Sequence, residues 1–234
     1  MKRLEKLYEG KAKVIYSTDN PDMLIQYFKD EASAFDGKKK GVIRGKGIVN
    51  NKISSRLFRY LEDKGIATHF VKRLSDREML VKRLEIIPVE VVMRNIAAGS
   101  LSKRMGIEEG VPLRMPILEY YYKSDELGDP MINHYHIEAF ELAQRFELDV
   151  MDKVAIEVNK YLSEFFDERG IILVDFKLEF GRHKDQLLLG DEITPDGCRL
   201  WDKSTKEKMD KDRFRWDLGK VEETYQEVCK KVLL

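Results

Sequence analysis

Three ionisable side chains alternate with apolar ones in a stretch that reads IILVDFKLEFG from Ile171. Successive side chains of a β-strand face opposite ways, so Asp175, Lys177 and Glu179 would share one face. The alternate apolar residues from Val174 to Phe180 would share the other face and contact a hydrophobic core. The charged face suits a metal and phosphate site, or else a solvated surface with ion pairs.

The segment after this strand predicts a second carboxylate near the first. A polar turn, GRHKDQ, is followed by the apolar run Leu187 to Leu189 and then by Gly190, Asp191 and Glu192, which is typical of the returning arm of an antiparallel hairpin. That arm would bring Asp191 close to Glu179. Two carboxylates on adjacent strands repel unless a cation lies between them, and partly hydrated oxygen ligands suit Mg²⁺ bound to phosphate. Whether the two residues face each other directly or diagonally stays open, because sequence does not fix strand register.

Two N-terminal stretches combine lysines with glycines. Lys11 and Lys13 lie beside the turn of a predicted hairpin over residues 4–16, where they could cover phosphates or form a solvated edge. The segment GKKKGVIRGKG, residues 37–47, is predicted to be a basic loop after a small-residue bend at residues 31–36. It could close over an acidic substrate, or it is simply a loop.

A further stretch, MRNIAAGSLSKR from Met93, could bind an anion. Its small residues would let backbone N–H groups approach a phosphate while Arg94 and Ser100 donate from their side chains. An equally good interpretation is a helix capped by Ser100 with its arginines in solvent. Another arginine, Arg199, follows the turn TPDG.

The apolar patterns that must position these residues predict an α+β fold. A helical period runs from Ile48 to Gly65, between strand-like patterns on either side. A second helical period runs from Met151 to Gly170, and a third starts near Gly219.

The chain divides into a strand-rich front and a helix-richer back. We expect a strand-rich nucleotide-binding lobe of residues 1–84, an α+β lobe of residues 85–234 that binds substrate and metal, and a hinge at residues 80–84.

The bulk composition excludes some classes of partner. Lys plus Arg and Asp plus Glu both number 42, so the net charge is +0 and no global field favours nucleic acid or anionic membrane. The start, MKRLEKLYEGK, lacks the apolar core of a signal peptide, and no apolar run reaches the roughly 20 residues of a membrane span. Cys198 and Cys229 suggest neither a disulfide framework nor a zinc site. We expect a cytoplasmic protein.

Common nucleotide and hydrolase motifs are missing. The sequence contains no GxxxxGK[ST], no GxGxxG and no GxSxG. A bound nucleotide would therefore not use a P-loop or a Rossmann turn.

Seven segments in order resemble the SAICAR synthetase (phosphoribosylaminoimidazole-succinocarboxamide synthase) family. They are YEGKAKVIY from Tyr8, SAFD from Ser33, KGIVNNKIS from Lys46, MRNIAAGSLSKRMGIEEG from Met93, YYKSDELGDPMIN from Tyr121, LVDFKLEFG from Leu173 and GDEITPDGCRLWD from Gly190. The resemblance implies an N-terminal lobe like that of protein kinases. It also implies an ATP-dependent ligase that joins carboxyaminoimidazole ribonucleotide (CAIR) to L-aspartate through an acyl phosphate, and a homodimer.

The resemblance also implies roles for individual residues. ATP contacts are expected at Lys11, Ala12, Lys13, Lys82, Leu84 and Lys123. Mg²⁺ ligands are expected at Glu179, Asp191 and Asp129. Lys177 would neutralise the transferring phosphoryl group, Asp175 would help to hold CAIR, and Arg94, Ser100 and Arg199 would bind the CAIR ribose phosphate. Ser33, Asp36 and Lys123 are candidates near the aspartate and the reacting carboxylate, with Asp36 counted as catalytic.

Two rival functions remain at this point. A kinase-like phosphotransferase would share the lobe and the carboxylates, but the chain has no HRD loop, and Asp175-Phe176-Lys177 puts a cation where a DFG motif has glycine. A non-catalytic nucleotide-binding module would bind Mg²⁺–ATP without turnover.

Overall fold

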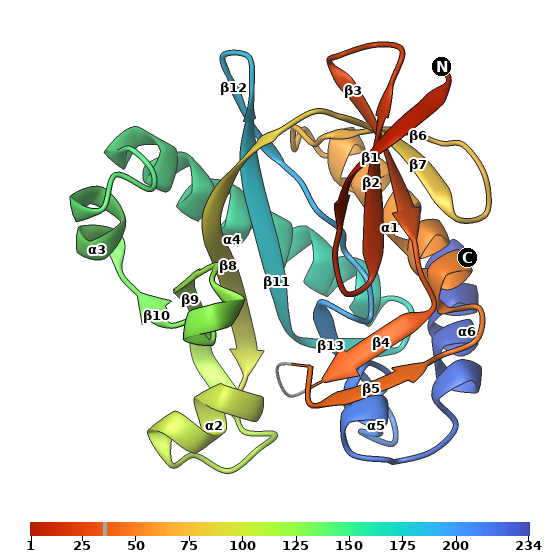
Figure 1. Ribbon diagram of the computed structural model, residues 1–234. Coiled ribbons are helices and arrows are strands. Elements are labelled where there is room, and N and C mark those ends of the chain that lie inside the picture. Colours follow the sequence, from red (N-terminus) through yellow and green to blue (C-terminus); the bar gives the residue numbers. More distant parts are fainter. Residues whose placement is uncertain (35–36) are drawn as a thin grey trace.

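The structure is a computed structural model that describes residues 1–34 and 37–234. Strands of the first part of the chain form one sheet, strands of the second part form another, and helices pack against both (Figure 1). The predicted α+β class is confirmed.

The N-terminal sheet is antiparallel throughout and has the order β1-β2-β3-β7-β6. Its strands are β1 (Arg3–Glu9), β2 (Lys13–Thr18), β3 (Met23–Phe28), β6 (Phe70–Arg73) and β7 (Glu78–Lys82). The helix α1 (Lys46–Asp63) packs against this sheet, because Ile53, Leu57 and Leu61 recur at helical spacing and are fully buried. It begins two residues before the predicted start.

The predicted basic loop contains a strand. β4 (Glu31–Ala34) pairs with β5 (Lys39–Val42) in a small antiparallel sheet, which corrects the expected bend and loop. A tertiary contact explains the difference. Gly41 lies so close to the ring of Phe214 that an added Cβ would be 2.9 Å from it, and the Lys39 ammonium lies 5.0 Å from the same ring.

The second sheet has the order β10-β9-β8-β11-β12, with β13 also paired to β11. Its strands are β8 (Glu85–Ile96), β9 (Pro112–Tyr122), β10 (Met131–Ile132), β11 (Ile171–His183), β12 (Gln186–Leu189) and β13 (Cys198–Asp202). The predicted hairpin is confirmed: β11 and β12 are antiparallel, with Phe180 opposite Leu189.

A bulge in β11 changes which apolar residues face the main core. Leu173 pairs with Leu200 and Asp175 with Arg199, so Val174 is an extra residue. Val174 packs with Ala98 and Trp201 in a separate small cluster, while Leu173 joins Phe176 in the main core. The prediction that Val174 shares a face with Phe176 was therefore wrong. The charged face from Asp175 to Glu179 lies beyond the bulge and keeps its alternation.

Helices cover the second sheet and its ends. They are α2 (Gly99–Met105), the 3₁₀ turn η1 (Asp125–Leu127), α3 (His134–Ala139), α4 (Arg145–Asp167), α5 (Asp212–Arg215) and α6 (Val221–Leu233). α4 packs on β11 and β8 through buried residues such as Met151 and Leu162, and α6 packs on α1. The N-cap of α2 is Ala98, so Ser100 does not cap that helix. None of the helices in the described ranges is long and apolar enough to cross a membrane.

Main-chain connections and main-chain hydrogen bonds join the two sheets. β7 leads into β8 through Arg83 and Leu84, and residues 67–69 pair with Leu189 at the end of β12. His69 N–H donates to the Leu189 carbonyl over 2.8 Å, and the Leu189 N–H donates to the Ala67 carbonyl over 3.1 Å.

Candidate active site

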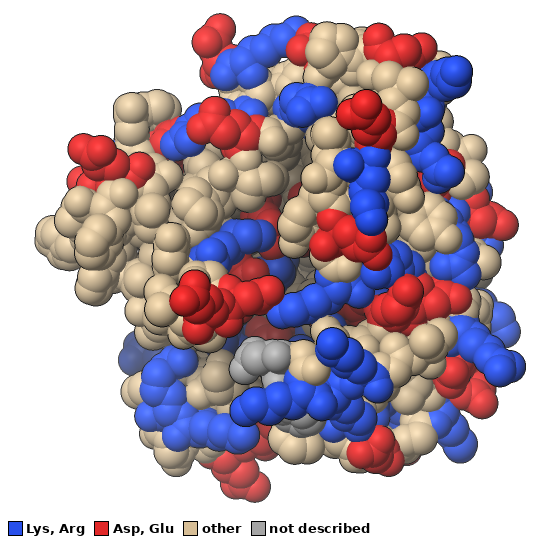
Figure 2. Space-filling model, in the orientation of Figure 1, with Lys and Arg blue, Asp and Glu red and all other residues tan. Residues whose placement is uncertain are grey.

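A cavity of about 910 Å³ lies between the two sheets and opens on the face shown in Figure 2. Lysines, arginines and carboxylates line it together, which is the pattern of red and blue around the hollow in that view. The volume is at the upper end for small-molecule sites and would hold a nucleotide with a second substrate.

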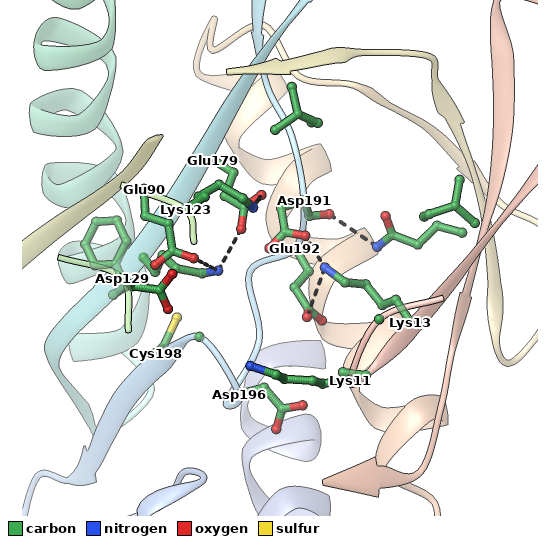
Figure 3. A pocket seen from close by; sticks show the side chains of 18 of the residues that line it. Lys11, Lys13, Glu90, Lys123, Asp129, Glu179, Asp191, Glu192, Asp196 and Cys198 are labelled. Atoms are coloured by element: carbon green, nitrogen blue, oxygen red, sulfur yellow. Dashed lines mark hydrogen bonds and ion pairs between the residues drawn. The ribbon is translucent and has the colours of Figure 1, made fainter. Parts of the chain in front are cut away.

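The two carboxylates of the predicted metal site lie in this cavity. The Gly190 N–H donates to the Glu179 carbonyl over 2.9 Å, which places Asp191 one residue beyond the ladder and diagonal to Glu179. The Lys13 ammonium donates to the Asp191 carboxylate and lies 3.2 Å from that of Glu192 (Figure 3). Lys13 therefore separates Asp191 from Glu192.

Two more lysines hold Glu179. Lys123 donates to Glu179 Oε2, and Lys177 donates to Glu179 Oε1 over 2.7 Å. Lys177 also donates over 2.7 Å to Glu90 Oε1 on β8. Glu90 was not among the predicted site residues, because only the pairing of β8 with β11 places it opposite Glu179.

The charges of this cluster stabilise one another. Burial lowers the pKa of Lys177, but the carboxylates of Glu179, Asp191 and Glu90 outweigh burial and raise the pKa well above its usual range. Burial likewise lowers the pKa of Lys13, and Asp191 and Glu192 outweigh it and raise the pKa. For Asp191 burial raises the pKa, and Lys13 and Lys177 outweigh it and lower the pKa. Both lysines are thus cations and Asp191 is an anion at neutral pH.

The main chain of Asp191 is held from the N-terminal sheet. Asp191 has φ of 60°, a left-handed conformation uncommon for a residue with a side chain. Gln26 on β3 donates to its carbonyl oxygen over 3.3 Å, and the buried ring of His69 hydrogen-bonds to its main chain. Burial lowers the pKa of His69 to about 3, so the ring is neutral.

The donor set fits Mg²⁺ bound together with a nucleotide. No group of three or more acidic, His or Cys side chains with metal-binding geometry occurs among the residues described. Mg²⁺ is usually held by one or two carboxylates plus substrate phosphates and water, which Glu179 and Asp191 satisfy. Asp129 lines the same cavity, and its carboxylate accepts from the Ser124 N–H over 2.9 Å.

Two arginines meet on one carboxylate at the other end of the cavity. Arg94 and Arg199 each donate from Nη1 to Asp175 Oδ2, over 2.9 and 2.8 Å. Arg94 also donates to Glu119, Ser100 and Tyr121, and Arg199 also donates to Asp212. These hydrogen bonds fix the orientation of both guanidinium groups, and the Ser100 hydroxyl lies 3.1 Å from Arg94 Nη2.

The start of α2 lies against this pair. A Cβ added to Gly99 would be 2.5 Å from Arg199 Nη2, and Gly99 has φ of 55°, so both the space and the conformation require glycine. Arg199 thereby reaches the N-terminus of α2.

The residues predicted to bind the nucleotide line the side of the cavity next to the N-terminal sheet. Lys11, Ala12, Lys82 and Leu84 all lie on the cavity wall. Lys11, labelled in Figure 3, donates to Asp125 over 2.8 Å, and the Lys82 N–H donates to the His69 carbonyl over 2.7 Å. Of the two other predictions, Ser33 lies in β4 and is not among the lining residues, and Asp36 lies outside the described residues.

Several residues that line the cavity were not predicted from the sequence to be site residues. They are Gln26, His69, Glu90, Glu192, Asp196, Lys211 and Arg215. Asp196 is the best anchored: the fully buried Lys46 ammonium donates to it over 2.6 Å, and so does the Tyr225 hydroxyl of α6. Lys211 makes no ion pair with any residue in the described ranges, and burial lowers its pKa. For Glu192, Asp196, Lys211 and Arg215, the sequence signal was their place in or beside the turn TPDG and the segment KMDKDRFR.

Known proteins of one family match the chain over nearly all of its length. A match to the SAICAR synthetase family spans residues 6–232. A phosphoribosylaminoimidazole-succinocarboxamide synthase from Caldanaerobacter subterraneus subsp. tengcongensis is 60% identical over 232 residues, which are 99% of each chain. The crystal structure of the synthase from Ehrlichia chaffeensis has 54% identity and a TM-score of 0.96, and the match covers 97% of this chain and 98% of that one. A SAICAR synthetase in complex with ADP has 47% identity and a TM-score of 0.94 over 96% of both chains.

Proposed function

Since the chain belongs to the SAICAR synthetase family and so condenses CAIR with L-aspartate to give SAICAR, ADP and phosphate, we propose that the cavity between the two sheets performs this ligation through an acyl phosphate. One observation carries the proposal. A cluster of lysines and carboxylates suited to ATP phosphates and a cluster of arginines suited to a ribose phosphate line the same cavity.

The chemistry requires activation before amide formation. An amine does not displace oxide from a carboxylate, so the γ-phosphoryl group of ATP passes first to a carboxylate oxygen of CAIR. The aspartate amine then attacks the acyl carbon, its proton is lost, and phosphate leaves. Both steps depend on positioning and on neutralising phosphate charge more than on a strong base.

The residues near the N-terminal sheet would bind the nucleotide. The adenine would lie beside Lys82 and Leu84, and the phosphates below the β1–β2 turn with Lys11, Ala12, Lys13 and Lys123. Glu179 and Asp191, helped by Asp129, would hold Mg²⁺, which when bound supplies positive charge to the phosphate oxygens. Lys177 would neutralise the phosphoryl group in transit.

The arginine end would hold CAIR. Arg94, Arg199 and Ser100 would bind its ribose phosphate, and Asp175 would orient both arginines while it contacts the rest of CAIR. Ser33 and Asp36 stay candidates for the aspartate end.

We propose the same chain division as the patterns suggest, a nucleotide lobe of residues 1–84 and a substrate and metal lobe of residues 85–234. The strand order supports it, because each sheet takes its strands from one of these ranges. The cytoplasm is the proposed location, and the two buried free thiols, Cys198 and Cys229, suit its reducing conditions.

A homodimer is the proposed assembly. Besides the family resemblance, it is supported by exposed large apolar side chains on and around α3 and on one face of α4. They are Tyr135, Phe140, Phe146, Val150 and Ile156. Such a patch is typical of a protein interface. A Phe146→Glu variant that stays folded should sediment as a monomer if this patch forms the dimer.

The function is tested by ADP release. With Mg²⁺–ATP, release should require both CAIR and L-aspartate, and succinate, which lacks the amine, should not replace aspartate. ADP release that ignores aspartate would contradict the proposal. CAIR labelled with ¹⁸O in its carboxylate should pass one labelled oxygen to the phosphate product, and unlabelled phosphate would exclude the acyl phosphate.

A further inference from the structure

Glu90 and Glu179 are two carboxylates that face each other directly across the β8–β11 ladder. Like charges in this arrangement repel, and both side chains are largely buried, with 18% and 7% of their surface exposed. The Lys177 ammonium lies between them, 2.7 Å from an oxygen of each. A single ammonium group thus forms ion pairs with both carboxylates.

This arrangement cannot persist unchanged when a divalent ion binds Glu179. Mg²⁺ coordinates oxygen at about 2.0–2.1 Å and repels an ammonium that shares the same carboxylate. Lys123 on Oε2 and Lys177 on Oε1 occupy both oxygens of Glu179. Of the two carboxylates that accept from Lys177 among the described residues, Glu90 would then be the one that keeps its hydrogen bond.

Glu90 stands apart from the proposed metal position. In Figure 3, Glu179 lies between Glu90 and Asp191, the second carboxylate that would hold the ion. Glu90 therefore lies on the outer side of the pair, where it can hold Lys177 beside the transferring phosphoryl group without entering the coordination sphere.

We propose that Glu90 is a positioning residue, which holds the Lys177 ammonium in place for phosphoryl transfer once Mg²⁺ occupies Glu179. The inference rests on the proposed function, because it concerns the same reaction. It adds a residue that touches neither substrate nor metal and that acts only through Lys177.

The variant Glu90→Gln tests this directly, because it keeps the side-chain size and one acceptor oxygen and removes the charge. We expect kcat to fall about 10- to 100-fold, as for a misplaced catalytic group. The Kd of Mn²⁺–ADP and the Mg²⁺ concentration for half-maximal rate should change less than about threefold. Glu85→Gln, on the same strand with an exposed carboxylate, is the matched control and should retain wild-type kcat.

Repeating the substitution in the Lys177→Ala variant separates the loss of positioning from small losses of stability. In Lys177→Ala the group that Glu90 positions is gone, so adding Glu90→Gln should lower kcat no further. A tenfold weaker Kd of Mn²⁺–ADP in Glu90→Gln would instead make Glu90 a metal ligand. A lower Tm with unchanged kcat would make its role structural. Either result overturns the inference, whereas a wild type without aspartate-dependent ADP release would overturn the proposed function itself.

Discussion

Gln26 on β3 donates a hydrogen bond over 3.3 Å to the main-chain carbonyl oxygen of Asp191, a residue 165 positions away. Gln26 is almost fully buried, and Asp191 has the left-handed φ of 60°. The bond therefore ties the middle of the N-terminal sheet to the turn that carries a proposed metal ligand.

Replacing Gln26 by leucine should weaken metal binding more than substrate binding. A buried carbonyl without a donor costs about 1 kcal/mol or more, and Asp191 would relax from its held conformation. We expect the Mg²⁺ concentration for half-maximal rate to rise about three- to tenfold, with the KM of CAIR within about twofold. Gln186→Leu, on the exposed part of β12, is the control. An unchanged Mg²⁺ requirement in Gln26→Leu would disprove the link.

Replacing Lys177 by alanine should lower the turnover number more than the affinity for the nucleotide. Removing the cation that neutralises the phosphoryl group should lower kcat by about 100-fold or more, while ADP affinity changes less than about threefold. Steady-state kinetics and calorimetry measure the two effects. Lys153→Ala on the exposed side of α4 should leave both unchanged. Near-normal turnover in Lys177→Ala would remove its proposed role.

Replacing Arg199 by alanine should weaken the binding of CAIR more than the binding of ATP. It removes one of the two guanidinium groups that converge on Asp175, and a charge-assisted hydrogen bond contributes about 1.5–3 kcal/mol. The Kd of CAIR should rise about 10- to 100-fold and that of ATP less than about threefold. Arg59→Ala, on the exposed side of α1, provides the comparison. Equal losses for CAIR and ATP would refute the ribose-phosphate assignment.

The buried histidine predicts how stability responds to acid. The pKa of His69 is about 3 in the folded chain, below its ordinary value near 6.5, so between these values the unfolded chain binds the proton and the folded chain does not. Stability from this group is complete above pH 6.5 and falls as the pH drops toward 3. At pH 4.5 the loss is about 2–3 kcal/mol. His69→Gln, which keeps an amide donor, should lose less stability than the wild type between pH 6.5 and 4.5 in urea titrations. Parallel curves for the two proteins would show that His69 does not stay neutral.

Local patterns were enough to predict the central hairpin. The alternation from Asp175 to Glu179, a polar turn and a short apolar run together specify β11 and β12, and the returning arm brings Asp191 to Glu179. Motifs with their own turn chemistry can be predicted in this way, because the information lies within about 20 residues.

Features that depend on a third strand could not be predicted. The bulge at Val174 exists because β13 pairs with β11 out of step, and Glu90 joins the site only through the register of β8. Register is set by packing across the sheet, which no single segment encodes. The same applies to β5, whose charged, glycine-rich sequence is ordered by the distant ring of Phe214.

The pairing of residues 67–69 with Leu189 decides whether the two parts of the chain could exist separately. If the chain were expressed as two polypeptides, residues 1–84 would expose the face of α1 that α6 covers. Residues 85–234 would expose the strand edge of β12 at Leu189, which pairs with residues 67–69. Bare apolar faces and open strand edges promote aggregation. Each fragment alone should precipitate, and the two expressed together should reassemble and co-purify, so the cut at residue 84 offers a split version of the enzyme.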